Sequence, residues 1–125
     1  MRLLLDTHTL IWGISEPEKL SEKTKELLSD VDNIILVSTA SLWELQVKKS
    51  LNKIILPEDF IFQLQENGYE LLNISYKHIE KLDEIPLIHR DPFDRILIAQ
   101  SMHENIPLIT KDSEIAKYNV KIILP

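Results

Sequence analysis

Residues 91–100 constrain the fold of this chain more than any other stretch of the sequence. Many helices begin with aspartate as the N-cap and proline at the first helical position, as Asp91 and Pro92 do here. Residues 96–99 then make one full helical turn without a polar side chain, and such a turn is buried on nearly every side. The sequence therefore predicts a central helix that carries a second acid, Asp94, in its first turn.

Asp94 also has an ordinary structural explanation. A Ser, Thr or Asp followed three residues later by an acid is a capping box, and acids suit the positive end of a helix dipole. A carboxylate at the mouth of a buried helix is nevertheless costly to desolvate unless a cation meets it there. The positions of the other acids therefore decide which explanation holds.

Length, charge and cysteine content limit the class of protein. A chain of 125 residues makes one domain, and a net charge of −6 argues against a nucleic-acid binder of the basic-patch type. The absence of cysteine excludes a disulfide framework and a thiolate metal site. No apolar run is long enough for a signal peptide or a membrane span, so we expect a soluble, cytoplasmic protein without membrane contact.

Short apolar runs alternate with helical patterns along the chain. Strands are predicted at residues 2–5, 34–37, 69–74, 107–110 and 120–124. Helices are predicted to open at residue 6 before a loop at 13–19, to run from 21 to a stop at 30–33, and then to occupy 39 or 41 to 50, 57–67, 75–82, 91–104 and 113–117. This alternation predicts a single α/β domain over residues 1–125, with a mainly parallel sheet flanked by helices.

The helix that contains Glu44 has two possible starts. Residues 41–44 match a capping box, which would give Glu44 a structural role at the helix start. A start at Thr39 instead places Glu44 in the second turn, free to point elsewhere. The lysines at 48, 49 and 53 form a basic cluster, which a solvated helix end favoured by the dipole explains equally well.

Four acids occupy corresponding places in this pattern. Asp6 and Asp112 each end an apolar strand, although Asp6 could simply cap the next helix, and the other two lie near helix starts at positions 44 and 94. In a parallel sheet these places share one edge, so the carboxylates could converge there. Like charges that close require a cation, and an all-oxygen set without cysteine favours Mg²⁺ or Mn²⁺ over zinc. Such sites commonly support metal-assisted hydrolysis of phosphodiesters.

Four motifs resemble the PIN-domain ribonucleases, most closely the VapC-type toxins of type II toxin–antitoxin pairs. They are residues Leu5–Trp12 (LDTHTLIW), Ser41–Glu44 (SLWE), His89–Arg95 (HRDPFDR) and Leu108–Asp112 (LITKD). Each motif is short, but together they follow the family's order and spacing over nearly the whole chain. The resemblance implies a PIN-like fold.

The resemblance also implies which residues carry the chemistry. The family's acidic quartet, which would bind one or two Mg²⁺ or Mn²⁺ ions, maps onto Asp6, Glu44, Asp94 and Asp112. The family's strand-end hydroxyl maps onto Thr110, and Asp91 is an extra acid of this subgroup's pattern. Candidate phosphate contacts are Arg90, Arg95 and Lys111. His8 is expected to be a packed or capping histidine.

The function implied is that of a metal-dependent endoribonuclease that cleaves single-stranded or structured RNA with a metal-activated water. It would act as a toxin with a cognate antitoxin protein, and the resemblance suggests a homodimer. The alternative is a non-catalytic PIN-fold RNA-binding or interaction module whose acids only cap helices. A phosphoacceptor domain also groups acids at strand ends, but Asp6 already lies on the first strand and no acid pair precedes it.

Overall fold

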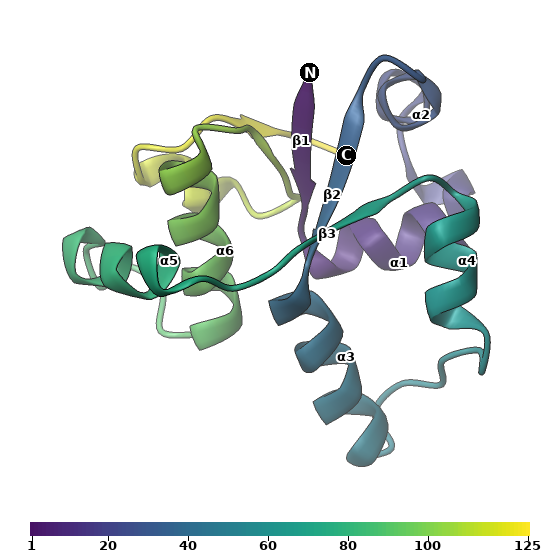
Figure 1. The fold of residues 1–125 in the computed structure, drawn as a ribbon, viewed down its shortest axis with the longest axis horizontal. Coiled ribbons are helices and arrows are strands. Elements are labelled where there is room, and N and C mark those ends of the chain that lie inside the picture. The colour runs from purple at the N-terminus through teal and green to yellow at the C-terminus, as the bar shows by residue number, and fades with distance from the viewer.

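A five-stranded sheet runs through the computed structural model, which describes residues 1–125 (Figure 1). The strand order is β3-β2-β1-β4-β5, and every neighbouring pair is parallel. The strands are β1 (Arg2–Leu5), β2 (Ile34–Ser38), β3 (Glu70–Leu72), β4 (Leu108–Ile109) and β5 (Ile122–Ile123). The predicted α/β class is confirmed, although the last three strands are shorter than the apolar runs that predicted them.

Helices connect the strands in chain order. They are α1 (Thr7–Ser15), α2 (Glu22–Ser29), α3 (Thr39–Ser50), α4 (Phe60–Glu66), α5 (Tyr76–Lys81) and α6 (Pro92–Glu104), with 3₁₀ turns η1 (Pro17–Lys19), η2 (Leu82–Glu84) and η3 (Ser113–Lys117). No helix combines the length and the apolar character that crossing a bilayer requires.

Three predicted segments differ from the structure, two in their boundaries and one in its type of helix. The loop predicted at residues 13–19 is partly helical, because α1 continues to residue 15 and 17–19 form η1. The helix predicted from residue 57 begins only at Phe60, after a turn in which the Phe60 amide donates to the Pro57 carbonyl at 3.1 Å. The helix predicted at 113–117 is a single 3₁₀ segment, a form common in such short connections.

The sheet buries one apolar cluster on each face, because side chains alternate along a strand. Leu4, Leu36 and Leu108 pack with α6 on one face, whereas Leu3 and Leu5 pack on the other face with residues of α1, α3 and α4. Figure 1 shows α5 and α6 on one side of the sheet and α1 and α4 on the other. The helices thus cover the sheet from both sides, as a parallel sheet requires.

Helix α6 is the central helix predicted from residues 91–100. The Asp91 side chain accepts hydrogen bonds from the amides of Phe93 and Asp94 at 2.8 and 3.2 Å, and Pro92 occupies the first turn. Residues 96–99 are all buried. The helix ends at Asn105, which takes the left-handed conformation with φ of 54°. The capped start and the buried turn of this helix fix the place of Asp94.

Candidate functional site

A polar hollow of about 400 Å³ lies where the first turns of α1 and α6 approach α3 and the segment after β4. None of the residues that line it is apolar. We call it the acidic hollow, and its lining residues are Thr7, His8, Glu44, Lys48, Asp91, Asp94, Lys111 and Asp112. Three of the four acids predicted to converge, those at 44, 94 and 112, therefore do so.

Glu44 reaches the acidic hollow because α3 starts at Thr39. The hydroxyl of Ser38 caps the helix by accepting from the Ala40 amide at 3.0 Å. Ser41 is buried, with its hydroxyl oxygen 3.1 Å from that of Thr7, so it makes no capping box with Glu44. Of the two starts that the sequence allows, the structure has the one that leaves Glu44 free to face inward.

Both carboxylate oxygens of Glu44 have partners. Oε1 accepts a 2.6 Å hydrogen bond from the Thr7 hydroxyl, and Oε2 lies 2.9 Å from Nζ of Lys48. These contacts come from two different helices, α1 and α3. They hold the carboxylate in one orientation at the wall of the acidic hollow.

Asp94 carries the least compensated charge of the group. No hydrogen bond or ion pair reaches its carboxylate. Burial, followed by the charges of Asp91 and Glu44, raises the pKa of Asp94 to about 6, and His89 opposes this. A carboxylate in this state favours either a proton or a cation beside it.

Asp112 is held between two segments. Its Oδ1 accepts from the amide of Glu114 at 3.0 Å, which caps η3, and its Oδ2 lies 3.2 Å from Nε2 of His89. The buried hydroxyl of Thr110 accepts from the Asp112 amide at 3.1 Å. Thr110, predicted as a supporting residue, thus fixes the backbone at the end of β4 and does not line the acidic hollow.

Asp6 caps α1, which is the structural explanation left open for it. Its Oδ1 accepts from the Thr9 amide at 2.8 Å, and the residue is buried. Asp6 does not line the acidic hollow, but its charge acts on His8, which does. Desolvation and Lys111 lower the pKa of His8, and the negative charge of Asp6 opposes them.

The predicted phosphate contacts lie in different environments. Lys111 lines the acidic hollow, with Nζ 5.4 Å from the centroid of the Trp12 ring. Arg90 is exposed and makes no hydrogen bond or ion pair. Arg95 donates to the carbonyl oxygens of Pro86 and His89 at 3.1 and 3.4 Å, so its guanidinium fastens the loop before α6. Its contact with phosphate stays a prediction.

The sequence pattern assigns no role at this site to Lys48 or His89. The prediction of a packed or capping His8 is wrong, because His8 is exposed and lines the acidic hollow. The signal for Lys48 was its spacing, because a lysine four residues after a glutamate lies on the same helix face. His8 follows the strand-end acid by two residues, whereas His89 reaches Asp112 only through the loop conformation.

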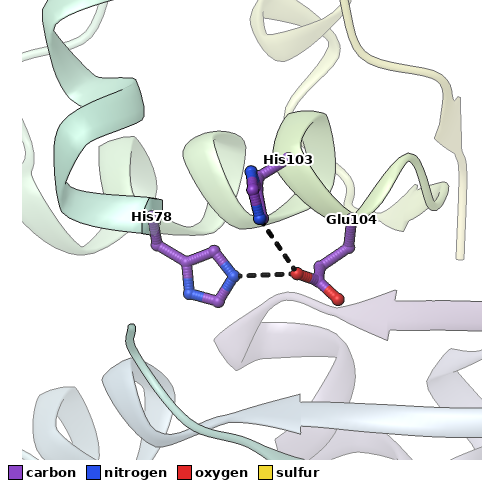
Figure 2. Close-up of side chains that lie close together, drawn as sticks. All are labelled: His78, His103 and Glu104. Carbon is purple, nitrogen blue, oxygen red and sulfur yellow. Dashed lines mark hydrogen bonds and ion pairs between the residues drawn. The ribbon is translucent and has the colours of Figure 1, made fainter. Parts of the chain in front are cut away.

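A second group of ligand-type side chains lies away from the acidic hollow, between α5 and the end of α6. Figure 2 shows that His78, His103 and Glu104 point toward one another, and their nearest ligand atoms lie within 4.8 Å. Nε2 of His78 lies 3.1 Å from Oε2 of Glu104, and Nε2 of His103 lies 3.8 Å from the same oxygen. Glu104 also pairs with Arg2 of β1 at 3.2 Å.

The hydrogen bonds of His78 favour a structural role for this group. Its Nδ1 accepts from the Ser75 amide at 3.0 Å, completing the capping box of α5. A neutral imidazole whose Nδ1 accepts must carry its proton on Nε2, which then donates to Glu104. A metal at Nε2 would displace that proton, and the neutral ring would then carry its proton on Nδ1. Nδ1 could no longer accept from the Ser75 amide, so the cap would be lost. We therefore assign the group as a hydrogen-bonded tie between α5, α6 and β1.

Known protein families and structures that resemble this chain share its fold. The PIN domain profile matches residues 3–121, almost the whole chain. This protein belongs to the PIN-domain family. No curated protein sequence matches the chain.

Solved structures share the fold of this PIN domain at low sequence identity. VapBC2 from Rickettsia felis, bound to a DNA fragment from their promoter, has a TM-score of 0.76 at 20% identity, with 98% of each chain covered. DNA-bound VapBC from Salmonella typhimurium has a TM-score of 0.73 at 16% identity, covering 98% of this chain and 97% of the other. FitAcB from Neisseria gonorrhoeae reaches 0.64 at 15% identity, with the same coverage.

Proposed function

We propose that this PIN-domain protein is a metal-dependent endoribonuclease. The observation that carries the proposal is the convergence of Glu44, Asp94 and Asp112 on one hollow without apolar lining. Three acids that are separate in sequence and lie on three segments meet there, and the raised pKa of Asp94 marks a place where positive charge is lacking. This is the arrangement expected of a phosphodiester hydrolase whose acids hold divalent cations.

The donor set fits Mg²⁺ or Mn²⁺. Every acidic donor is a carboxylate oxygen, the ligand type that these ions prefer. The residues that would hold the ion are Glu44, Asp94 and Asp112. Asp6 does not line the acidic hollow and would act through its charge or through a bound water. When bound, such an ion supplies an activated water at neutral pH and positive charge for the developing phosphorane.

The chain's own residues would orient and neutralise the reactants. Thr7 fixes Oε1 of Glu44, and the Glu114 amide fixes Oδ1 of Asp112, so these carboxylates are positioned before substrate arrives. Nε2 of His89 lies 3.2 Å from Oδ2 of Asp112 without a hydrogen bond. One of these carboxylates would accept the proton of the attacking water. Lys111 lines the acidic hollow and Arg90 is free of other partners, so both remain candidates for phosphate contacts.

The toxin role is part of the same proposal. The structural neighbours are chains of complexes described as VapBC, and we propose that this protein also acts in the cytoplasm with a cognate antitoxin, as a homodimer. A hollow of about 590 Å³ lies beside α1 and α2, and five of its 14 lining residues are hydrophobic. We propose that an apolar segment of the antitoxin lies over these early helices. An arginine from that partner could take the place of metal charge at the acids.

Two tests address the partner. The product of the adjacent reading frame should co-purify with this protein and restore growth when the two are expressed together. A neighbour that neither binds nor restores growth would contradict the toxin role but not the nuclease activity. Light scattering of the purified protein tests the homodimer.

The nuclease activity is tested by hydrolysis of single-stranded RNA. Cleavage should require Mg²⁺ or Mn²⁺ and stop with excess EDTA. Asp94→Asn, purified in the same way, is the matched control, because a contaminating nuclease would be present in both preparations. Equal cleavage by the two proteins, or undiminished cleavage in EDTA, would contradict the proposal.

The capping bonds favour one alternative, a non-catalytic module. Asp6, Asp91 and Asp112 each accept hydrogen bonds from backbone amides at a helix start. A module in which the acids act only as caps would show no stoichiometric Mn²⁺ site by calorimetric titration. The nuclease proposal requires one, and Asp94→Asn should weaken it.

A further inference from the structure

Lys48 is the cation with the most direct contact to the carboxylates of the acidic hollow. It lies one turn after Glu44 on α3, and its Nζ is 2.9 Å from Oε2 of that residue. Its side chain is about one-third exposed, while that of Glu44 is 13% exposed. The ammonium group therefore sits inside the polar wall with the acids.

This pair differs from the other short-range ion pairs of the chain. Lys25 with Glu22 and Lys77 with Glu80 also lie one turn apart, but their carboxylates are 86% and 50% exposed. Pairs of that kind contribute little and face water. The carboxylate that holds Lys48 is instead one that we propose to bind metal, so its negative charge would be shared with the ion.

We propose that Lys48 contacts the phosphate of the RNA strand at the cleavage position. This inference rests on the proposed nuclease function and adds a substrate contact to it. Once Glu44 shares its charge with a divalent ion, the ammonium beside it keeps its position. One of its N–H donors is then free to face the acidic hollow. A phosphate drawn to the metal would meet Lys48 there as a point-charge partner.

Lys111, the other lysine of the acidic hollow, is placed differently. Its Nζ lies over the face of Trp12, at 5.4 Å from the ring centroid, and it follows β4 instead of lying on α3. The two lysines thus enter the acidic hollow from separate segments. A strand that passes between them could place its cleaved phosphate at Lys48 and a neighbouring phosphate at Lys111.

Binding of RNA without cleavage tests this contact. The background is Asp94→Asn, with Mn²⁺ at a concentration that saturates its weakened site. The probe is a fluorescently labelled single-stranded RNA whose anisotropy is measured over a range of salt concentrations. Lys48→Ala should weaken binding about tenfold at low salt and lower the slope of log affinity against log salt by about 0.7, the value for one phosphate contact on a single strand. Lys48→Arg should retain the slope.

Lys49→Ala is the matched control. Lys49 is the next residue on α3, is exposed, makes no ion pair and carries the same charge, so it should leave the slope unchanged. Thermal melts exclude unfolding, and Lys48→Gln provides a second neutral variant. Calorimetry without RNA should show that Lys48→Ala binds Mn²⁺ at least as tightly as the wild type, because it removes a competing cation and no ligand.

The outcomes separate the two proposals. If Lys48→Ala and Lys49→Ala change the salt slope equally, or if Lys48→Ala mainly lowers Mn²⁺ affinity, Lys48 only positions Glu44 and this inference is wrong while the nuclease function stands. If the Asp94→Asn protein does not bind RNA and the wild type does not cleave it, the proposed function itself fails.

Discussion

The hydroxyl of Thr7 donates a 2.6 Å hydrogen bond to Oε1 of Glu44, joining the first turn of α1 to the second turn of α3. These helices follow the neighbouring strands β1 and β2. Because β1 and β2 are parallel neighbours, the helices that follow them start side by side, and this bond holds the two helix starts together. The orientation of one carboxylate of the acidic hollow depends on it.

Thr7→Val removes the hydroxyl that makes this bond but keeps the shape of the side chain, so it should isolate the contribution of the hydrogen bond. Loss of a donor to a half-buried carboxylate is expected to cost about 1–2 kcal/mol of unfolding free energy. Mn²⁺ affinity should fall as well, because Glu44 is no longer oriented, while Thr7→Ser should keep both. Denaturant unfolding and calorimetric titration measure the two quantities, and unchanged Mn²⁺ affinity in Thr7→Val would show that Lys48 alone orients Glu44.

Asp91 and Asp94 should separate although they lie three residues apart. Asp91 accepts two amide bonds at the start of α6, so Asp91→Ala should cost about 1 kcal/mol, as for other N-caps, and leave most cleavage activity intact. Asp94→Asn should abolish cleavage yet leave the metal-free protein equally or more stable, because it removes an uncompensated charge. Melts in EDTA and cleavage assays in Mn²⁺ check both. If Asp91→Ala were inactive but fully stable, the assignment of the capping role to Asp91 and the catalytic role to Asp94 would be wrong.

The raised pKa of Asp94 predicts how stability depends on pH in the absence of metal. The folded protein holds this proton up to about pH 6, whereas the unfolded chain releases it near the ordinary aspartate value. The stability that the proton confers is therefore fully present below that ordinary value and is lost as the pH rises through 6. Relative to Asp94→Asn, the wild type should lose about 1 kcal/mol over this range, a figure reduced because the carboxyl is partly solvated.

Melts of the two proteins in chelator from pH 4 to 7.5 measure this difference. At pH 7, saturating Mn²⁺ should instead make the wild type more stable than Asp94→Asn, since only the wild type gains stability from a tightly bound ion. A constant difference between the two proteins at all these pH values would show that Asp94 titrates normally.

The parts of the fold that the sequence predicted are those set by local chemistry. Asp91, Pro92 and Asn105 mark the ends of α6 because a cap, a fixed φ and a left-handed C-cap act within one turn. The apolar runs of β1 and β2 predicted central strands for the same reason, since residues 3–5 and 35–37 are apolar and buried on both faces of the sheet. The chain order of strands and helices then placed the acids on one edge.

The parts that the sequence did not predict depend on contacts between segments. Three hydroxyl residues precede Glu44, and the start of α3 was settled only by the contact of Ser41 with Thr7. Arg95 looked like a phosphate contact by its place in the motif, but the loop before α6 supplies carbonyl acceptors for it. His89 reaches Asp112 through that same loop, whose conformation no local signal specifies.

The tie between α5 and α6 gives a last prediction, on stability alone. His78 is almost fully buried and bonds to both the Ser75 amide and Glu104, so His78→Ala should cost about 2–3 kcal/mol. His103 is exposed and lies as far as 3.8 Å from Glu104, so His103→Ala should stay within about 0.5 kcal/mol of the wild type. RNA cleavage by His78→Ala, measured well below its melting temperature, should persist, because the group lies outside the acidic hollow.

The pH dependence of this loss has a definite sign. The hydrogen bond from His78, followed by that from Arg2, lowers the pKa of Glu104, so the ionised carboxylate stabilises the fold above the ordinary glutamate value. This stabilisation disappears as the pH falls through the lowered value. The gap between wild type and His78→Ala should therefore narrow below about pH 4. If Zn²⁺ instead raised the melting temperature of the wild type but of neither histidine variant, the group would be a metal site and the assigned tautomer of His78 would be wrong.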